Sequence, residues 1–308
     1  MRICFFLENN NKPSIDFSNP SKTGNVGMGG TEYMIWTVAY YLQLIYKELE
    51  VIILAPHTNK MPEITKNIKC KNIQESIEIA ELDDCDYLVL RTDPKNRREY
   101  SEAIEQSTIR IIKWSHNFEH IDFVNFAKEC KNITYNVCVS KEQKDRLMDH
   151  DIYMKTQYIY NGLDFSLYDS VYKEKKENIV CYCGAPTAYK GFEKILKIWS
   201  DIEKKVPDAK LYVIGIAKLY NDNQKLGKYG IAESAFERRI EPYITKNGKL
   251  KSNIIFFGNC AHSEKVSIIK KAKVGIVNPI PHDETFCISA VEFQALGVPV
   301  VGGYTFGL

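Results

Sequence analysis

Short apolar runs alternate with longer amphipathic stretches along the whole chain. The run RICFFL (2–7) is typical of a buried strand, and after a polar loop the apolar-rich stretch 31–49 predicts a helix with Thr31 as its N-cap. Strands that are apolar at nearly every position belong to parallel sheets covered on both faces. The same pattern in the first half predicts strands at 51–56, 86–91, 109–117 and 133–140, helices near 97–107 and before 133, and a helix begun by Ser140 with Gln143 in a capping box.

The second half repeats this strand–helix alternation, with a polar insertion at 216–252 that contains one helix. The turn-rich segment 160–169 links the halves, so we expect two doubly wound α/β domains, residues 1–165 and 166–308. Ligands of such sheets bind beyond the carboxyl ends of the strands, which makes a cleft between the domains the expected site. The predicted strands are 178–185, 209–215, 253–258, 274–279 and 298–303, and the predicted helices are 191–205, 263–272 and the one that follows Glu284.

Composition narrows the class of protein. The chain is 44% hydrophobic and 26% charged, its apolar runs are only strand-length, and its start lacks the pattern of a secretory signal, so we expect a cytoplasmic protein. Nine cysteines without a C-x-x-C pair favour packing thiols over disulfides or zinc. Residues 1–168 carry 20 basic against 24 acidic side chains, and residues 169–308 carry 21 against 15. This bias suits an anionic ligand in the second half, fits an ordinary surface equally well, and is too mild for nucleic acid.

The stretch ETFCISAVE (284–292) combines two carboxylates with a helix start. With Thr285 as the cap, the N–H groups of Phe286, Cys287 and Ile288 have no intrahelical acceptor and attract phosphate or a polyhydroxylated ligand. Glu292 lies about two turns further on and leans back toward the helix start, where it can meet the same ligand as Glu284. Two glutamates at this spacing on a solvated surface remain the alternative on spacing alone.

The stretch resembles the E-x7-E region of the retaining glycosyltransferases of family four, with Cys287 where Gly is usual and Phe293 where Ala is usual. Further motifs follow in the family's order. GMGGTEYM (27–34) resembles its Gly-Gly loop through Gly29 and Gly30, and KWSHN (113–117) places His116 at a strand end.

YCGAPTAYKGF (182–192) resembles the family's Gly-Arg…Lys-Gly loop. Lys190 matches the lysine that holds the donor diphosphate, but Ala185 stands where an arginine is expected. We therefore expect weaker stabilisation of the leaving group unless another cation reaches the site. Candidates by composition are Lys218, Arg238 and Arg239.

The resemblance implies a GT-B fold of two facing Rossmann-like domains, with the acceptor on residues 1–165 and a nucleoside-diphosphate sugar on residues 166–308. It implies sugar transfer with retention to a sugar, a lipid-linked or another hydroxyl acceptor, in surface polysaccharide or glycolipid synthesis. Lys190, Glu284 and His116 would be catalytic. Gly29, Gly30, Phe286, Cys287, Ile288 and Glu292 would bind the donor, with Glu292 on the ribose.

The family works without a metal or a resident cofactor, and we expect neither here, with UDP or GDP as the donor nucleotide. The chain ends soon after VPVV, where the family continues, so we expect a shortened C-terminal domain. Peripheral contact with the inner face of a membrane is compatible with this function. The sequence does not predict an oligomeric state.

Two other functions stay open. A nucleotide-sugar epimerase or a phosphorylase can share this architecture, and a degenerate transferase can act as a non-catalytic binding module. Ala185 and the early end favour the second, whereas Glu284, Glu292, His116 and Lys190 oppose it. A dehydrogenase fits poorly, because no G-x-G-x-x-G follows the first strand of either half.

Overall fold

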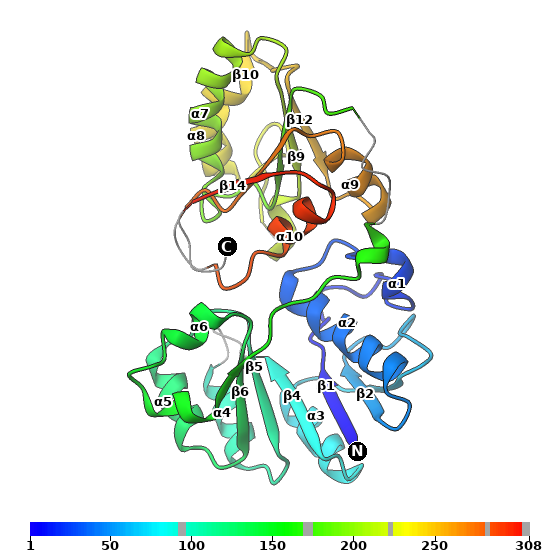
Figure 1. Ribbon diagram of the computed structural model, residues 1–308. Helices are drawn as coiled ribbons and strands as arrows, with labels where there is room; N and C mark the ends of the chain where they lie inside the picture. The colour runs from blue at the N-terminus through cyan, green and yellow to red at the C-terminus, as the bar shows by residue number, and fades with distance from the viewer. Residues whose placement is uncertain (92–96, 169–174, 221–223, 281–283, 304–308) are drawn as a thin grey trace. The chain divides into compact units, whose positions relative to one another are not determined.

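The computed structural model describes residues 1–91, 97–168, 175–220, 224–280 and 284–303 (Figure 1). Its contacts divide the chain into two compact units, each considered by itself below. Of the described residues, the first unit holds Met1–Lys22 and Gly30–Gly162, and the second holds Thr23–Gly29 and those from Leu163 to Gly303. Among the described residues, no helix has the length and apolar character needed to cross a membrane.

The first unit is built on a seven-stranded sheet in which every pair of neighbouring strands is parallel. The strand order is β3-β2-β1-β4-β5-β6-β7. Strands β2 and β3 lie on one side of β1 and strands β4 to β7 on the other, so a topological switch point lies between β1 and β4. The strands are β1 (Arg2–Phe6), β2 (Glu50–Ala55), β3 (Lys66–Lys69), β4 (Tyr87–Arg91), β5 (Ile111–Ser115), β6 (Ile133–Cys138) and β7 (Thr156–Tyr158).

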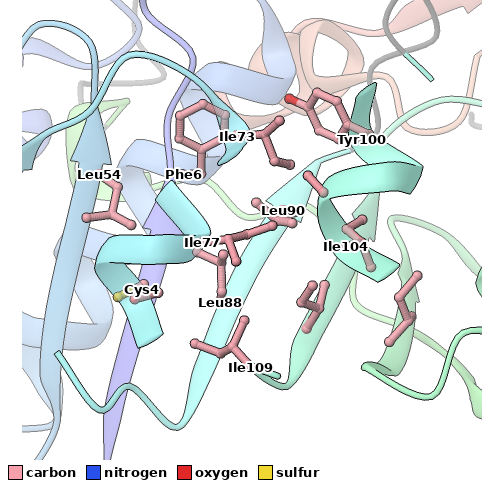
Figure 2. Close-up of a cluster of buried hydrophobic side chains, with 14 of the residues drawn as sticks. Cys4, Phe6, Leu54, Ile73, Ile77, Leu88, Leu90, Tyr100, Ile104 and Ile109 are labelled. Atoms are coloured by element: carbon pink, nitrogen blue, oxygen red, sulfur yellow. The ribbon is translucent and has the colours of Figure 1, made fainter. Parts of the chain in front are cut away.

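Helices cover this sheet because its central strands are apolar on both faces. On one face, Cys4 and Phe6 pack against α3 and α4 (Figure 2). The long helix α2 packs against β2 and β1 and buries Met34 and Trp36. The helices are α1 (Pro20–Thr23), α2 (Gly30–Ile45), α3 (Ile73–Leu82), α4 (Arg97–Glu105), α5 (Ile121–Glu129) and α6 (Lys141–Asp145), with a short 3-10 helix η1 (Asp151–Lys155).

The second unit repeats the design with a five-stranded parallel sheet of order β12-β9-β8-β13-β14. Its first strand again lies inside the sheet, and the switch point lies between β8 and β13. One apolar cluster contains Trp199 of α7 and Phe236 of α8, and the other contains Ile269 of α9 and Phe293 of α10. The strands are β8 (Ile179–Cys183), β9 (Lys210–Ile214), β12 (Ile254–Gly258), β13 (Val274–Val277) and β14 (Val300–Gly302). The helices are η2 (Phe165–Leu167), α7 (Phe192–Lys205), η3 (Ala217–Tyr220), α8 (Ser234–Ile244), α9 (His262–Ile269) and α10 (Ile288–Ala295).

The predicted insertion between β9 and β12 holds η3, α8 and the small hairpin β10 (Thr245–Lys246) and β11 (Lys249–Leu250). Its loop is organised by Glu237 of α8, which is 1% exposed. The carboxylate accepts the backbone N–H groups of Tyr229 at 2.7 Å, Ile231 at 2.8 Å and Ala232 at 3.1 Å. Three N–H donors compensate the buried charge, so this glutamate is structural.

The alternating architecture predicted from the sequence is confirmed, but the prediction missed α1, β3, α3, η1 and β7 in the first unit. The first long helix begins at Gly30 and ends at Ile45, so Thr31 lies inside its first turn and the prediction of Thr31 as N-cap was wrong. The prediction at Ser140 is confirmed, since its hydroxyl accepts the N–H of Gln143 at 3.2 Å. The Gln143 side chain bonds the N–H of Val139 at 2.9 Å and not that of Ser140, so the box is shifted by one residue.

Lys113 of β5 carries a buried charge in the core of the first unit. Its ammonium group donates to Ser115 Oγ at 2.8 Å, to Asn136 Oδ1 at 2.6 Å and to the carboxylate of Glu119. Lys113 is 1% exposed, and all three of its N–H donors have acceptors. This network ties β5, β6 and the loop that carries His116 together.

Substituting Lys113 by Met is expected to lower the free energy of unfolding by about 3–5 kcal/mol, because Glu119 would be left as an uncompensated buried charge. Urea denaturation measures the loss. Lys141→Met is the matched control, because Lys141 is exposed and pairs with Asp145 only one helical turn away, and it should change stability by about 0.5 kcal/mol or less. Equal stabilities for the two variants would show that Glu119 is not left as a costly unpaired charge when Lys113 is removed.

Candidate functional site

The loop that follows β8 lies at the switch point of the second sheet. Gly215, at the end of β9, has φ +136°, and a Cβ there would lie 2.3 Å from the carbonyl oxygen of Gly184. The neighbouring Ala185 is 3% exposed, and its carbonyl accepts the hydroxyl of Tyr182 at 3.1 Å. Position 185 is thus packed into the unit and offers no cation.

Lys190 lies at the end of the same loop, directly before α7. Its amide donates to Thr187 Oγ1 at 3.2 Å. Gly191 follows as the N-cap of α7 with φ +70°, and a Cβ there would lie 2.6 Å from Ile280. Glycine therefore suits this position on two counts, the left-handed backbone and the close approach of the segment after β13.

Glu284 comes from the other side of the switch point, after β13. Asn278, whose φ is +38°, donates its Nδ2–H to Glu284 Oε2 at 2.5 Å, and the amides of Thr285 and Phe286 also donate to the carboxylate. Burial raises the pKa of Glu284, while the Lys190 charge acts to lower it. The structure therefore brings Lys190 and Glu284, 94 positions apart in sequence, to one edge of one sheet.

The start of α10 differs from the prediction. The N-cap is Cys287, which makes no side-chain capping bond, so the expected cap at Thr285 was wrong. Two of the three amides expected to be free have acceptors: that of Phe286 donates to Glu284, and that of Ile288 donates to the Phe286 carbonyl at 3.1 Å. Cys287 packs in the apolar cluster, and burial raises its pKa to about 12.

Glu292 lies in α10 with only 3% of its surface exposed. Its Oε1 accepts the Tyr168 hydroxyl at 2.8 Å and the Lys265 ammonium at 2.5 Å. No described residue donates to Oε2 in a hydrogen bond that the structure records. One oxygen of this carboxylate is thus committed within the unit, which the sequence did not predict.

His116 belongs to the first unit and follows β5. It is 7% exposed, and its ring centroid lies 4.5 Å from that of Trp114. Burial, and to a lesser degree the positive charge of Arg91, lowers its pKa to about 3. The imidazole is therefore neutral at pH 7 and acts as a polar group without charge.

Gly29 and Gly30 lie at the start of α2, with Gly29 buried and Gly30 exposed. The loop before them is shaped by Asn25, whose Oδ1 accepts the amides of Gly27 and Met28, each at 2.9 Å. The loop thereby uses its own amides just before the helix. No acceptor is recorded for the Gly29 amide among the described residues.

Sequence reasoning missed Asn278, Tyr168 and Lys265. A polar residue directly after an apolar strand, as in VGIVNP, is a signal that could have found Asn278. Of the cations suggested as substitutes for an arginine at 185, Arg239 is paired with Glu193 at 2.7 Å and Arg238 bonds Ser234 at 3.4 Å on its own helix. Lys265, a cation that the sequence analysis left out, is joined to Glu292 by a salt bridge of 2.5 Å.

Comparisons with known proteins bear on the fold and on the second unit. The family model "Glycosyl transferases group 1" matches residues 167–308, and a search of curated proteins finds no match. Among solved structures, the chain is similar to a sucrose-phosphate synthase from Thermosynechococcus elongatus, with a TM-score of 0.66, 14% identity, and coverage of 99% of this chain and 82% of that one.

Two further solved structures are similar to this chain over most of its length. The apo form of the lipopolysaccharide outer core galactosyltransferase WaaB aligns with a TM-score of 0.57 and 14% identity over 98% of this chain and 80% of that one. An E. coli structure named as trehalose-6-phosphate bound with UDP-2-fluoro glucose aligns with a TM-score of 0.57 and 12% identity over 99% of this chain and 84% of that one. The chain therefore has the GT-B fold, and its residues 167–308 match the glycosyl transferases group 1 family, which supports a transferase enzyme.

Proposed function

We propose that the protein is a retaining glycosyltransferase that moves a sugar from a nucleoside-diphosphate sugar to an acceptor hydroxyl. The observation that carries this proposal is that Lys190 and Glu284 lie within electrostatic reach of each other at the switch point of the second sheet. This sheet belongs to residues 167–308, which match a glycosyltransferase family model. A cation and a carboxylate within electrostatic reach of each other suit a sugar diphosphate, the cation for its phosphates and the carboxylate for its sugar hydroxyls. UDP or GDP is the proposed nucleotide, and a UDP-sugar is named in one structure of the same fold.

Departure of the diphosphate leaves negative charge on a phosphate oxygen and positive character on the sugar. Lys190 would stabilise the phosphate, and amides at the start of α10 would add to it, because preorganised donors act where charge develops. Glu284, held by Asn278, would accept hydroxyl hydrogens of the donor sugar. Glu292 would accept from the ribose.

The resemblance assigns His116 of the first unit to the sugar near the reacting carbon, and it assigns Gly29 with Gly30 to the phosphates. A neutral His116 can contact the sugar without repelling its developing positive charge. The leaving phosphate is the proposed acceptor of the proton from the attacking hydroxyl. The chain's own residues thus supply binding and electrostatics, and no protein nucleophile and no metal is invoked.

The acceptor class is proposed from the family alone. A sugar or lipid-linked acceptor in surface polysaccharide or glycolipid synthesis, at the cytoplasmic face of a membrane, agrees with the lipopolysaccharide transferase of the same fold. The competing hypotheses for the same architecture are an epimerase, a phosphorylase and a non-catalytic binding module. Product analysis separates them, because an epimerase yields an altered donor, and a binding module yields no product at all.

The first experiment is a thermal-shift and calorimetric panel of UDP-, GDP-, ADP-, CMP- and dTDP-sugars. One nucleotide sugar is expected to stabilise the protein by mass action, and NMR of the product with an acceptor panel is expected to show the retained anomer. Failure of every nucleotide sugar to bind would refute the proposed function. An inverted product would refute retention alone.

Lys190→Met is expected to lower kcat by about 10²–10³-fold, the usual cost of removing one electrostatic donor from a developing charge. Steady-state kinetics with the nucleotide sugar identified above measures the loss. Lys194→Met is the matched control, since Lys194 is an exposed lysine of α7 four residues away, and its kcat should equal that of the wild type. Equal rates for both variants would remove Lys190 from the mechanism.

The pH dependence tests Glu284. The ionised carboxylate of Glu284 is the form that accepts hydrogen bonds from the sugar hydroxyls, and burial raises its pKa above the ordinary glutamate value of 4.5. As the pH is lowered, kcat/KM should therefore begin to fall at a pH above 4.5. Asn278→Ala removes a donor that favours the charged form, so the pKa rises further and the acid limb moves to higher pH.

Glu284→Gln serves as the reference for this profile, because a variant without the carboxyl should lose the limb. A limb that stays in place in Asn278→Ala, or that moves to lower pH, would contradict the positioning of Glu284 by Asn278.

A further inference from the structure

Three buried polar side chains of the second unit are joined by hydrogen bonds at α10. Tyr168 follows η2, Lys265 lies in α9 and Glu292 lies in α10, and they are 3%, 8% and 3% exposed. We call them the Glu292 cluster. The hydroxyl of Tyr168 and the ammonium of Lys265 both donate to the same oxygen, Oε1, at 2.8 and 2.5 Å.

Lys265 has hydrogen-bonding capacity that the cluster does not use. An ammonium group has three N–H donors, and the recorded bonds of Lys265 Nζ to described residues use one, to Glu292. Burial acts to lower the pKa of Lys265, but the charge and hydrogen bond of Glu292, together with smaller effects of Cys183 and Cys260, raise the pKa above the ordinary value, so the side chain is charged. A buried ammonium with two spare donors is expensive unless other oxygens reach it.

Glu292 shows the complementary pattern. Its Oε1 is occupied twice, while Oε2 accepts no recorded hydrogen bond from the described residues. With respect to the described residues, this single ion pair thus keeps one acceptor oxygen and two donor hydrogens unused. Cys183, the last residue of β8, is within electrostatic reach of both Lys265 and Glu292, which places the pair beside the carboxyl end of that strand.

The chemistry of this arrangement matches a vicinal diol. One hydroxyl can donate to Oε2 while the oxygen of its neighbour accepts from Nζ. A phosphate fits less well, because the adjacent carboxylate cancels the lysine charge and repels an anion. The pair as a whole is neutral and bifunctional, as a neutral polyol requires.

We propose that Lys265 is a donor-binding residue that donates to one hydroxyl of the nucleotide ribose while Glu292 accepts from the other. This inference rests on the proposed function, which already assigns Glu292 to the ribose. What it adds is that Lys265 binds the ribose together with Glu292, while Tyr168 holds Oε1 in place. Lys265 would therefore make the protein bind ribonucleotides more tightly than deoxyribonucleotides.

The test compares nucleoside diphosphates that differ by one hydroxyl. The nucleotide-sugar panel identifies the base. The nucleoside diphosphate with that base is then titrated calorimetrically, together with its 2′-deoxy and 3′-deoxy counterparts. The wild type is expected to bind the ribonucleotide about tenfold more tightly than one or both deoxy forms, the effect of one lost hydrogen bond to a charged group.

Lys265→Met should weaken binding of the ribonucleotide about tenfold and leave the affinity for the corresponding deoxynucleotide nearly unchanged, so that the preference disappears. The deoxy form whose discrimination is lost identifies the hydroxyl that Lys265 contacts. Lys271→Met, at an exposed lysine just beyond α9, should keep the preference of the wild type. Tyr168→Phe should keep it in large part, because Lys265 remains.

A folded Lys265→Met variant with the full preference of the wild type would overturn the inference and make Lys265 structural. If circular dichroism shows that this variant does not fold, Lys265→Gln, which is uncharged but keeps an N–H donor, is judged by a reduced preference in the same titrations, and an unchanged preference overturns the inference. A wild type that binds ribo- and deoxynucleotides equally also overturns it. A wild type that binds no nucleotide refutes the proposed function itself, so the two failures are distinguishable.

Discussion

Parallel pairing of the strands is the constraint on which the remaining features of each unit depend. A parallel strand needs a crossover connection, so helices must cover both faces of the sheet, and the carboxyl ends of all strands reach the same edge. Lys190 and Glu284 meet for this reason alone: each follows a strand that borders the switch point of the order β12-β9-β8-β13-β14. The chemistry at that edge is a consequence of the topology, and the side chains need no long-range contact of their own to find each other.

Buried charges in both units have partners. In the second unit Glu284 has Asn278 and two amides, and Glu292 has Tyr168 and Lys265. In the first unit Lys113 has three acceptors. Buried pairs of this kind add little net stability, because desolvation offsets most of the Coulomb attraction. Their effect is on geometry: a carboxylate held by fixed donors presents its remaining oxygen in one direction. Such fixed dipoles are what a site needs if it is to bind charge without reorganising.

The sequence predicted the architecture well because buried parallel strands are continuous apolar runs. It missed β3 and β7 because both are short edge strands, and β3, with the sequence KNIK, is half lysine, as exposed sheet edges often are. The helix α3 had a readable signal, since Asn72 caps the amide of Glu75 at 3.0 Å and the Glu75 carboxylate returns to the amide of Lys71 at 2.7 Å.

The details of the candidate site were harder to predict for physical reasons. In SEKVSIIKKA, Lys265 reads as one polar residue among several, and its burial depends on Glu292, 27 positions further along the chain. The expected cap at Thr285 failed because the Glu284 carboxylate takes the first amides itself, so the helix starts later, at Ile288. Local rules describe a helix end correctly only when no neighbouring side chain competes for the same donors.

Ala185 and the Glu292 cluster together bear on how this unit would manage the charge of a diphosphate. Each of the two lysines near the switch point has a carboxylate within electrostatic reach: Lys265 forms an ion pair with Glu292, and Lys190 acts on the pKa of Glu284. Position 185 adds no cation, because it is a buried alanine next to the close approach of Gly184 and Gly215. Binding of an anion would then depend on direction more than on net charge: Lys190 must lie nearer to the phosphate oxygens than Glu284 does, with Glu284 turned toward the sugar. The bond from Asn278 to Glu284 Oε2 fixes the direction of that carboxylate, so under the proposed function the electrostatics of the leaving group would depend on one amide side chain just after β13.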